Sequence, residues 1–443
     1  MYTNDSASAW PVRSAKHGNF KLWAMRTAGV VLGVGLATAT LADTVSVSKD
    51  CPPGGPCMVT GNTPQIGRFR LTSSPFFWEA QYMGSATQAR RFWLSPTGAN
   101  MATIQLTTNA GDTQGTASLA NGIYFISIQT FQMGPGNYAV YGPGVHGDPH
   151  ITTTNGINYD FQGAGEFVML KLKDRYEVQT RMSPVATTGP LPPNPHTGLS
   201  TCVSINTAAA VRVGTHRVTY QPNISGQPDP SGMQLRIDGV LISDQAVEKL
   251  LDDGSKISRD ATSGELRIEH RDYTGVRITP NWWNSQNLWY LNVDMTPPAG
   301  TSGIAGEIAA HGGWLPALAD GSSMGTRPVD LHDRYKALYV KFADSWRVAD
   351  SGTLFDYAPG TSTKTYTMQT WPGEEGQCDL PFTVPVQGVH ADVAAQACKG
   401  VWSPRLKTFC QFDVMVTGDK GFGRSYEIAQ GLPITKERAP TSK

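Results

Sequence analysis

The most informative stretch of the chain reads Gly147-Asp148-Pro149-His150-Ile151-Thr152-Thr153-Thr154-Asn155-Gly156-Ile157-Asn158-Tyr159-Asp160-Phe161. A residue before proline favours extended backbone, so Pro149 predicts an extended approach to a strand. Asp148 is of a residue type that makes hydrogen bonds within turns, and we expect the neighbouring His150 to do the same. The stretch therefore predicts a turn that opens a β region.

Residues 147–350 contain many short runs in which apolar and charged residues alternate. Residues 166–182 form a hairpin pattern of period two, and an Asp-Gly pair at Asp238 signals another hairpin. Alternation of this kind places one face of a sheet in the core and the other in water. Only residues 247–251 and 391–398 have a helical pattern, so we predict a mainly β fold.

The chain of 443 residues is long enough for two or three domains. Regularly spaced short strands upstream of the Gly147 stretch predict a small β-sandwich. We expect a signal peptide at 1–42, a linker at 43–62, the β-sandwich at 63–142, an antiparallel β domain at 147–350 and a Cys-containing C-terminal extension at 351–443.

The N-terminus has the pattern of a secretory signal peptide. Lys16, Lys21 and Arg26 precede an apolar run over residues 28–42, which ends in the small-x-small site Thr40-Leu41-Ala42. The run is shorter than the roughly 20 residues that span a bilayer, so we expect no stable membrane span after cleavage. The predicted location is secreted, extracellular or cell-surface, with the periplasm as an alternative.

Export changes the interpretation of the cysteines, because exported chains meet an oxidising environment. Six cysteines allow many pairings. Proximity in sequence favours one bridge near the start and another near the end of the mature chain, which leaves a long-range bridge by elimination. The resulting pairs are Cys51 with Cys57, Cys398 with Cys410, and Cys202 with Cys378.

Composition excludes several classes of function. The formal net charge is zero, so no electrostatic argument favours nucleic acid or an anionic membrane as a partner. The sequence has no His-Glu-x-x-His and no phosphate-binding glycine loop. We therefore predict that the protein is not a conventional enzyme and has no certain cofactor.

The Gly147–His150 motif and the following Tyr159-Asp160-Phe161-Gln162-Gly163 resemble the opening of a von Willebrand factor type D domain. The similarity continues through Gly303–Gly306 to Phe342–Val348, which resembles the closing Phe-x-x-Ser-Trp strand of that family. Residues 410–419 resemble the Cys-x-Phe-Asp-Val-x-Thr-Gly-Asp tail that often follows such domains. The resemblance implies a type D-like β domain over 147–350 with a disulfide-bearing tail.

Two departures from the family concern disulfides and calcium. Three cysteines of the family fall at Gly165, Ser302 and Ala305, so a bridge is lost whole and oligomer-forming disulfides are in doubt. In the family a calcium ion binds a turn residue and a later acidic or amide group. The matching positions here are Asn155 and Glu307, both oxygen donors, so the resemblance implies a possible calcium site.

Chemistry is conceivable at the Asp148–Pro149 bond. In some family members this bond breaks in mild acid, when the Asp carboxylate attacks its own carbonyl and the Pro nitrogen leaves protonated. His150 could supply that proton. The alternative is a structural turn, which the sequence favours.

His146 and His150 are also better explained as structural residues than as metal ligands. The aromatic residues Trp282, Trp283, Trp289 and Tyr290 are better explained as packing residues.

From these observations we predict a secreted or cell-surface adhesion or matrix-interaction protein, whose partner is an extracellular protein or glycan. The alternatives are an extracellular enzyme or enzyme-associated substrate-binding module, or a calcium-dependent structural spacer. A deep polar pocket away from Asp148 would favour the enzyme, and an exposed apolar or aromatic face would favour adhesion.

Overall fold

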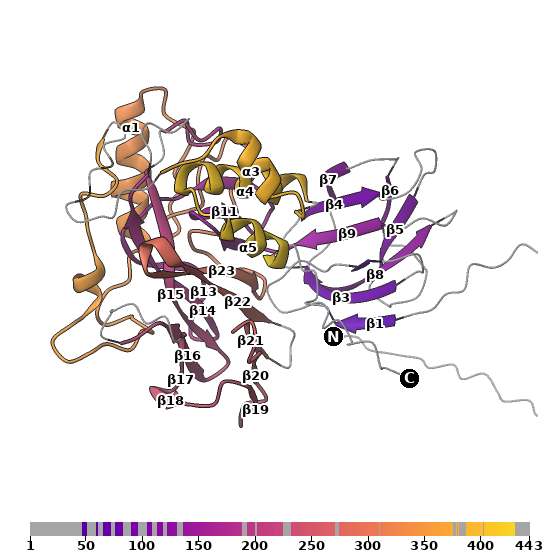
Figure 1. The fold of residues 1–443 in the computed structure, drawn as a ribbon, viewed down its shortest axis with the longest axis horizontal. Helices are drawn as coiled ribbons and strands as arrows, with labels where there is room; N and C mark the ends of the chain where they lie inside the picture. Colours follow the sequence, from indigo (N-terminus) through magenta and orange to yellow (C-terminus); the bar gives the residue numbers. More distant parts are fainter. Residues whose placement is uncertain are drawn as a thin grey trace, which may run out of the picture. The chain divides into compact units, whose positions relative to one another are not determined.

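A computed structural model describes the chain over residues 142–187, 193–199, 202–224, 232–270, 274–309, 311–374, 378, 380, 387–401 and 403–429, and over the backbone of nine strands that come before residue 142. Within this part the fold is mainly β, as predicted, with a helical, disulfide-bearing tail (Figure 1). The predicted signal peptide, residues 1–42, lies outside the described residues.

The nine N-terminal strands form two sheets, in keeping with the predicted β-sandwich. The described strands are arranged in the orders β1-β3-β8-β5-β6 and β2-β9-β4-β7. Their bounds are β1 Val47–Asp50, β2 Val59–Thr60, β3 Gln65–Leu71, β4 Phe76–Tyr82, β5 Arg90–Ser95, β6 Ile104–Thr108, β7 Thr113–Ala117, β8 Gly122–Thr130 and β9 Gly136–Tyr141.

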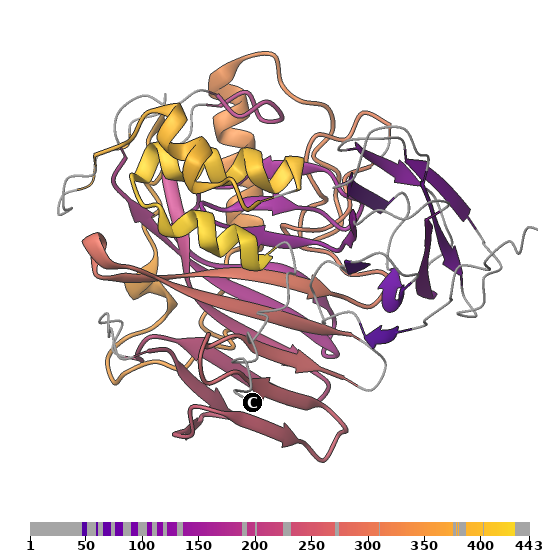
Figure 2. The same cartoon turned by 45° about the vertical axis from the view of Figure 1, so that its right-hand side comes forward.

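The following strands form two larger antiparallel sheets (Figure 2). Among the described residues their orders are β12-β11-β10-β23-β22-β21-β20-β19 and β13-β14-β15-β16-β17-β18. The bounds are β10 Gly144–His146, β11 His150–Thr152, β12 Asn158–Asp160, β13 Gly165–Leu172, β14 Tyr176–Val185, β15 Val203–Val213, β16 His216–Gln221, β17 Gln234–Ile237, β18 Val240–Ile242, β19 Val247–Leu250, β20 Lys256–Arg259, β21 Leu266–Glu269, β22 Gly275–Trp283 and β23 Leu288–Thr296.

The main core is built from the inward residues of both large sheets. Val145, Ile151 and Val293 of one sheet belong to the same buried cluster as Val178 and Val211 of the other. The period of two explains this arrangement, because alternate residues of a strand point to the same face. The predicted hairpin over residues 166–182 is confirmed, with β13 and β14 paired from Gly165↔Met182 to Leu172↔Tyr176.

Two expectations about secondary structure are wrong. Residues 247–251 do not form a helix, because Val247–Leu250 is the edge strand β19 and pairs with β20. Phe342–Val348 is not a closing strand, because it contains the end of a π-helix, Lys336–Phe342, and the helix α2, Ala343–Trp346. The buried Leu338, Phe342 and Trp346 explain this difference, since their spacing of four places them on one helical face.

A bundle of three helices in the C-terminal extension covers part of the eight-stranded sheet. The predicted helix at 391–398 is confirmed as α3, Ala391–Ala397; α4, Pro404–Thr417, and α5, Gly421–Ala429, were not expected. The N-cap of α4 is Ser403, whose side chain accepts a hydrogen bond from the Leu406 N–H. Figure 2 shows the bundle along β22 and β23, where α5 makes its sheet contacts.

Two of the three predicted disulfides lie within the described residues and are confirmed. Cys202 bonds to Cys378, and Cys398 bonds to Cys410 between α3 and α4. Cys51 and Cys57 lie outside the described residues, so their bridge stays a prediction. No helix in the described part of the chain has the length and apolar character needed to cross a membrane.

Candidate functional site

The Gly147 stretch forms a tight turn between two paired strands. His146 of β10 lies opposite His150 of β11, and Gly147 in the turn has a φ of 57°. A β-carbon at Gly147 would lie 1.9 Å from Asp413 Oδ2 and 2.3 Å from the Tyr426 hydroxyl. Both backbone conformation and space therefore require glycine where this turn meets the C-terminal helices.

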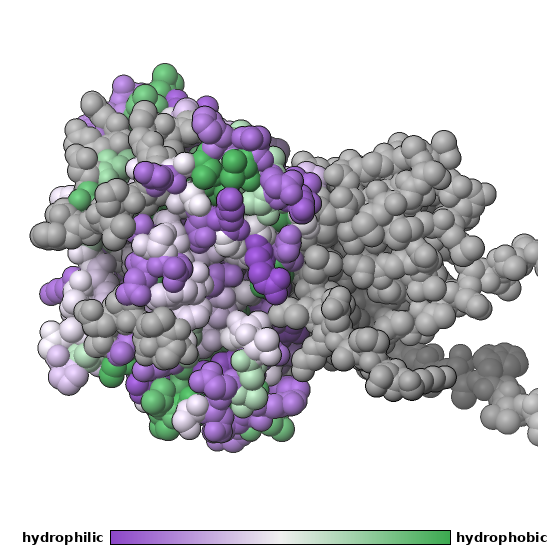
Figure 3. Space-filling view, in the orientation of Figure 1, coloured by the Kyte–Doolittle hydropathy of each residue, from purple (hydrophilic) through white to green (hydrophobic). Residues whose placement is uncertain are grey.

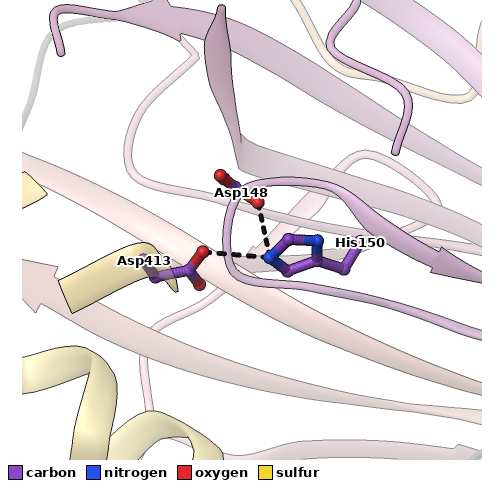
Figure 4. Close-up of side chains that lie close together, drawn as sticks. All are labelled: Asp148, His150 and Asp413. Carbon is purple, nitrogen blue, oxygen red and sulfur yellow. Dashed lines mark hydrogen bonds and ion pairs between the residues drawn. The ribbon is translucent and has the colours of Figure 1, made fainter. Parts of the chain in front are cut away.

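The His150 imidazole is the centre of a cluster of acidic residues, which we call the His150 cluster. Its Nδ1 lies 2.7 Å from Asp160 Oδ1 on β12. Its Nε2 lies 2.7 Å from Asp148 Oδ1 and 3.0 Å from Asp413 Oδ1 on α4 (Figure 4). Three carboxyl groups, from the turn, a strand and the tail, therefore share one ring.

The cluster is sealed from solvent. Asp148 and Asp413 are fully buried, and His150 is 3% exposed. The α4 ring of Phe409 stacks on His150 with centroids 4.2 Å apart, and Phe412 meets it edge-on. The Tyr426 hydroxyl of α5 donates a hydrogen bond of 2.8 Å to Asp413 Oδ2. Closure by the tail excludes the water that would otherwise solvate the charges.

Burial changes the acid–base behaviour of each group. It raises the pKa of Asp148 well above its usual range, and the neighbouring Asp413 raises it further. It also raises the pKa of Asp413. Burial alone would lower the pKa of His150, but the three carboxyl groups reverse this and raise it well above its usual value. The cluster therefore retains protons that free side chains would release.

Asp148 is held by two neighbours within this cluster. Its Oδ1 lies 2.7 Å from His150 Nε2, and its carboxyl group also interacts with that of Asp413. Asp148 and Asp413 therefore share the Nε2 side of His150.

A second buried histidine lies beside the cluster. His146 Nε2 lies 2.8 Å from Asp294 Oδ1 on β23, and Asp294 in turn lies 3.6 Å from the Arg277 guanidinium. His146 and His150 come from different strands and do not face one site as a helical i, i+4 pair would. The structural interpretation of His146 agrees with this environment.

Two sets of acidic residues and histidine in the described part of the chain have the spacing of metal ligands. One is Asp148, His150 and Asp413; the other is His216, Asp252 and Asp253. Ligands about 2.1 Å from a tetrahedral ion lie about 3.4 Å apart. The separations of 2.7 and 3.0 Å around His150 Nε2 are shorter and fit a shared proton.

The positions expected to bind calcium do not fit that role. Asn155 is buried, and its amide donates to the Ile308 carbonyl while its oxygen accepts from Thr153 Oγ1 and the Ile308 N–H. Glu307 is exposed. The Asn155 oxygen therefore already serves as an acceptor inside the protein, and its contacts tie two segments of the chain together.

The aromatic residues of β22 and β23 form packing contacts, as predicted. Trp282 and Trp289 are cross-strand partners with ring centroids 5.2 Å apart. Trp283 and Tyr290 are buried against Phe422 of α5. These contacts anchor the tail helices that close the His150 cluster.

Sequence reasoning singled out Asp148, Pro149 and His150 but missed three members of the site. Asp160 and Asp413 stand out in the sequence only as parts of motifs, and Tyr426 belongs to none of these motifs. Asp413 lies 263 positions from His150. The residues around Asp413 do have a helical signal, a Ser-Pro start at Ser403 and a Gly stop at Gly418, which could have placed it on a helix.

Comparison of the sequence with protein-family models and with curated proteins finds no match. The resemblance of the Gly147–His150 motif to a type D domain therefore stays a prediction that rests on the residues themselves.

Proposed function

We propose that this chain is an exported interaction protein of the extracellular space or cell surface, built on a type D-like β domain, which acts by binding and does not turn over an external substrate. The observation that carries the proposal is the sealing of the His150 cluster. An external substrate would have to displace α4 to reach Asp148 or Asp413, both fully buried.

Apolar side chains at two sheet edges support a binding role. Val240 and Leu241 on β18 are 65% and 47% exposed, and Leu250 on β19 is 74% exposed. These strands end the six-stranded and eight-stranded sheets. Figure 3 shows apolar surface at the end of the molecule where Figure 1 labels β18 and β19. Exposed apolar groups on edge strands favour a protein partner, because proteins bind such edges by strand addition.

A binding assay with the mature chain, residues 43–443, tests this proposal. The chain is immobilised and exposed to purified extracellular proteins and neutral glycans. We expect a protein to bind, and the double variant Leu241→Ser, Leu250→Ser to weaken binding at least about tenfold. Val340→Ser, an exposed apolar residue of the π-helix, is the matched control. Binding to nothing, or turnover of a tested compound, contradicts the proposal.

A second candidate function, self-cleavage at Asp148–Pro149, is favoured by one specific observation. Asp148 is buried, carries a raised pKa and lies 2.7 Å from His150 Nε2, beside a ring that can hold the proton for the leaving nitrogen. In the proposed step an Asp148 carboxylate oxygen forms a bond to the carbonyl carbon of the same residue. The bond from that carbon to the Pro149 nitrogen breaks, and the nitrogen takes a proton from the cluster.

The products of this step balance without a co-reactant other than water. The first product is a five-membered cyclic anhydride at Asp148, and the second is a chain that begins with the secondary amine of Pro149. Water then opens the anhydride to two carboxyl groups. The cut ends would remain held together, because β10 upstream of the bond pairs with β11 and β23 downstream.

Incubation of the purified mature chain between pH 4 and pH 7 tests self-cleavage. We expect a fragment that begins at Pro149 to appear on denaturing gels, faster in acid, and to be absent in Asp148→Asn. Because the two confirmed disulfides both lie downstream of the Asp148–Pro149 bond, the fragment should be released without reduction. A chain that stays intact over this range excludes the second candidate.

A further inference from the structure

We propose that Asp413, on the tail helix α4, is a positioning residue of the Asp148–Pro149 cleavage site, so that the C-terminal tail sets the acidity at which the bond breaks. This inference rests on the self-cleavage proposed above and assigns its control to a segment far away in sequence.

The geometry makes Asp413 part of the site. Its Oδ1 lies 3.0 Å from His150 Nε2, the same nitrogen that lies 2.7 Å from Asp148 Oδ1. Figure 4 shows both carboxyl groups directed at this one atom. Two acids that share one imidazole nitrogen in a closed site compete for the same proton.

This competition gives Asp413 a chemical task. Asp148 must be ionised to attack its own carbonyl, yet the leaving nitrogen of Pro149 needs a proton from the same cluster. With Asp413 present, the proton can reside on Asp413 or His150 while Asp148 is ionised. Without it, the only other carboxyl group in contact with the ring, among the residues that the structure describes, is Asp160, which lies on Nδ1 at the opposite side.

The groups that face His150 are Asp148 from the turn, Asp160 from β12 and Asp413 from α4, with Phe409 and Phe412 as uncharged cover. Tyr426 from α5 acts through Asp413. Removing the Asp413 charge should lower the pKa of both His150 and Asp148, because its charge raises both. Removing the Tyr426 hydroxyl should raise the pKa of Asp413, because that hydrogen bond lowers it.

These directions predict pH profiles of cleavage that move in opposite senses. In Asp413→Asn the profile moves to lower pH, and the rate near pH 6 falls about tenfold or more, as expected for a displacement of about one pH unit on the limb where the rate declines with rising pH. In Tyr426→Phe the profile moves to higher pH. Asp392→Asn, the same chemical change at an exposed position of α3, leaves the profile of the wild type unchanged.

The experiment measures the Pro149-starting fragment against time from pH 4 to pH 7 in all four proteins, with a chelator present throughout. Opposite displacements in Asp413→Asn and Tyr426→Phe support the proposal, because a merely structural loss would slow both without opposite shifts. Coincident profiles of Asp413→Asn and wild type overturn it.

If the wild type does not cleave, self-cleavage fails, and urea unfolding then tests the tail's control of the cluster separately. As the pH rises from 5 to 8, the free energy of unfolding of the wild type should fall relative to that of Asp413→Asn. The reason is that the folded wild type retains protons that the folded variant does not. A difference that is constant with pH overturns the assignment of Asp413.

Discussion

Two histidines of this protein each lie among three aspartates, one group inside the fold and one at its surface. The buried group is the His150 cluster. In the other, His216 Nδ1 lies 2.7 Å from Asp238 and Nε2 lies 2.7 Å from Asp252, with Asp253 at 4.0 Å. We call this the His216 cluster. Composition and distances are similar, but Asp252 in the second cluster is 88% exposed along its side chain.

The difference in burial reverses the behaviour of the acids. Burial raises the pKa of Asp148 and Asp413, so they hold protons. In the His216 cluster, the effect of partial burial on Asp253 is outweighed by hydrogen bonds from Thr215 and Ser255, which lower its pKa to about 2. The same residue types therefore form a proton-sharing network when sealed and an ordinary set of surface ion pairs when solvated.

The largest expected effect comes from removing each histidine. His150→Ala leaves three carboxyl groups near a closed cavity without their shared cation, which should lower the free energy of unfolding by about 3–5 kcal/mol. His216→Ala should cost about 0–1 kcal/mol, because water solvates its partners. Urea unfolding at pH 7 compares the two, and equal losses would remove the distinction between the clusters.

The next effect comes from loosening the tail that seals the His150 cluster. Replacing Cys398 and Cys410 by Ala should destabilise the fold by about 3 kcal/mol, as expected for a short closed loop. It should also allow faster amide exchange in α4. The matched control removes the Cys202–Cys378 bridge, which should lower stability without selectively exposing α4. Unchanged exchange in the first variant argues against the tail as a cover.

A smaller effect is expected in the pH dependence of stability. The pKa of Asp148 is higher in the folded than in the unfolded state, so this residue stabilises the fold most at a pH below its unfolded pKa. That stabilisation is lost as the pH rises through the folded pKa. Above pH 4 the wild type should therefore lose up to about 1.4 kcal/mol per pH unit for each proton that only the folded state retains. Asp148→Asn should lack this part of the slope. Parallel curves from pH 4 to pH 8 would contradict the prediction.

The smallest effect is expected at the surface. The pKa of Asp253 in the folded state is lowered to about 2, so this residue stabilises the fold at a pH above its unfolded pKa. The stabilisation is lost as the pH falls through the folded pKa. Asp253→Asn should cost about 0.5–1.5 kcal/mol at pH 7, from hydrogen bonds to the Thr215 and Ser255 N–H groups, and little below pH 2. A loss that grows in acid would be inconsistent with this sign.

The sequence predicts the β region well because its signal is local. Alternation within β13 and β14 specifies both strand type and buried face, and the Gly147 turn lies between the strands as expected. The errors at Val247–Leu250 and Phe342–Val348 have a common cause. A short apolar segment fits both the helical and the strand period. Pairing with β20 makes Val247–Leu250 a strand, and burial of Phe342 and Trp346 on one face makes the second segment helical.

The candidate site was half predicted for a similar reason. Asp148 and His150 lie two positions apart in one motif, and their chemistry follows from residue type. Asp413 and Tyr426 reach them only because α4 and α5 fold back over β22 and β23, a contact that depends on Trp283, Tyr290 and Phe422. No local pattern in a single sequence encodes that long-range docking, so the burial that changes the acids' behaviour could not be predicted.

The most direct test of the sealed, proton-sharing cluster is an NMR titration of the histidine side chains in the intact chain with nitrogen-15 label. Burial within three carboxyl groups predicts that the His150 ring stays protonated well above the usual pH range of histidine, with both nitrogens hydrogen-bonded and slow exchange with water. His216 should also titrate above its usual value, but with rapid exchange. A neutral His150 ring at pH 6.5, or one that exchanges as fast as His216, would contradict the sealed cluster.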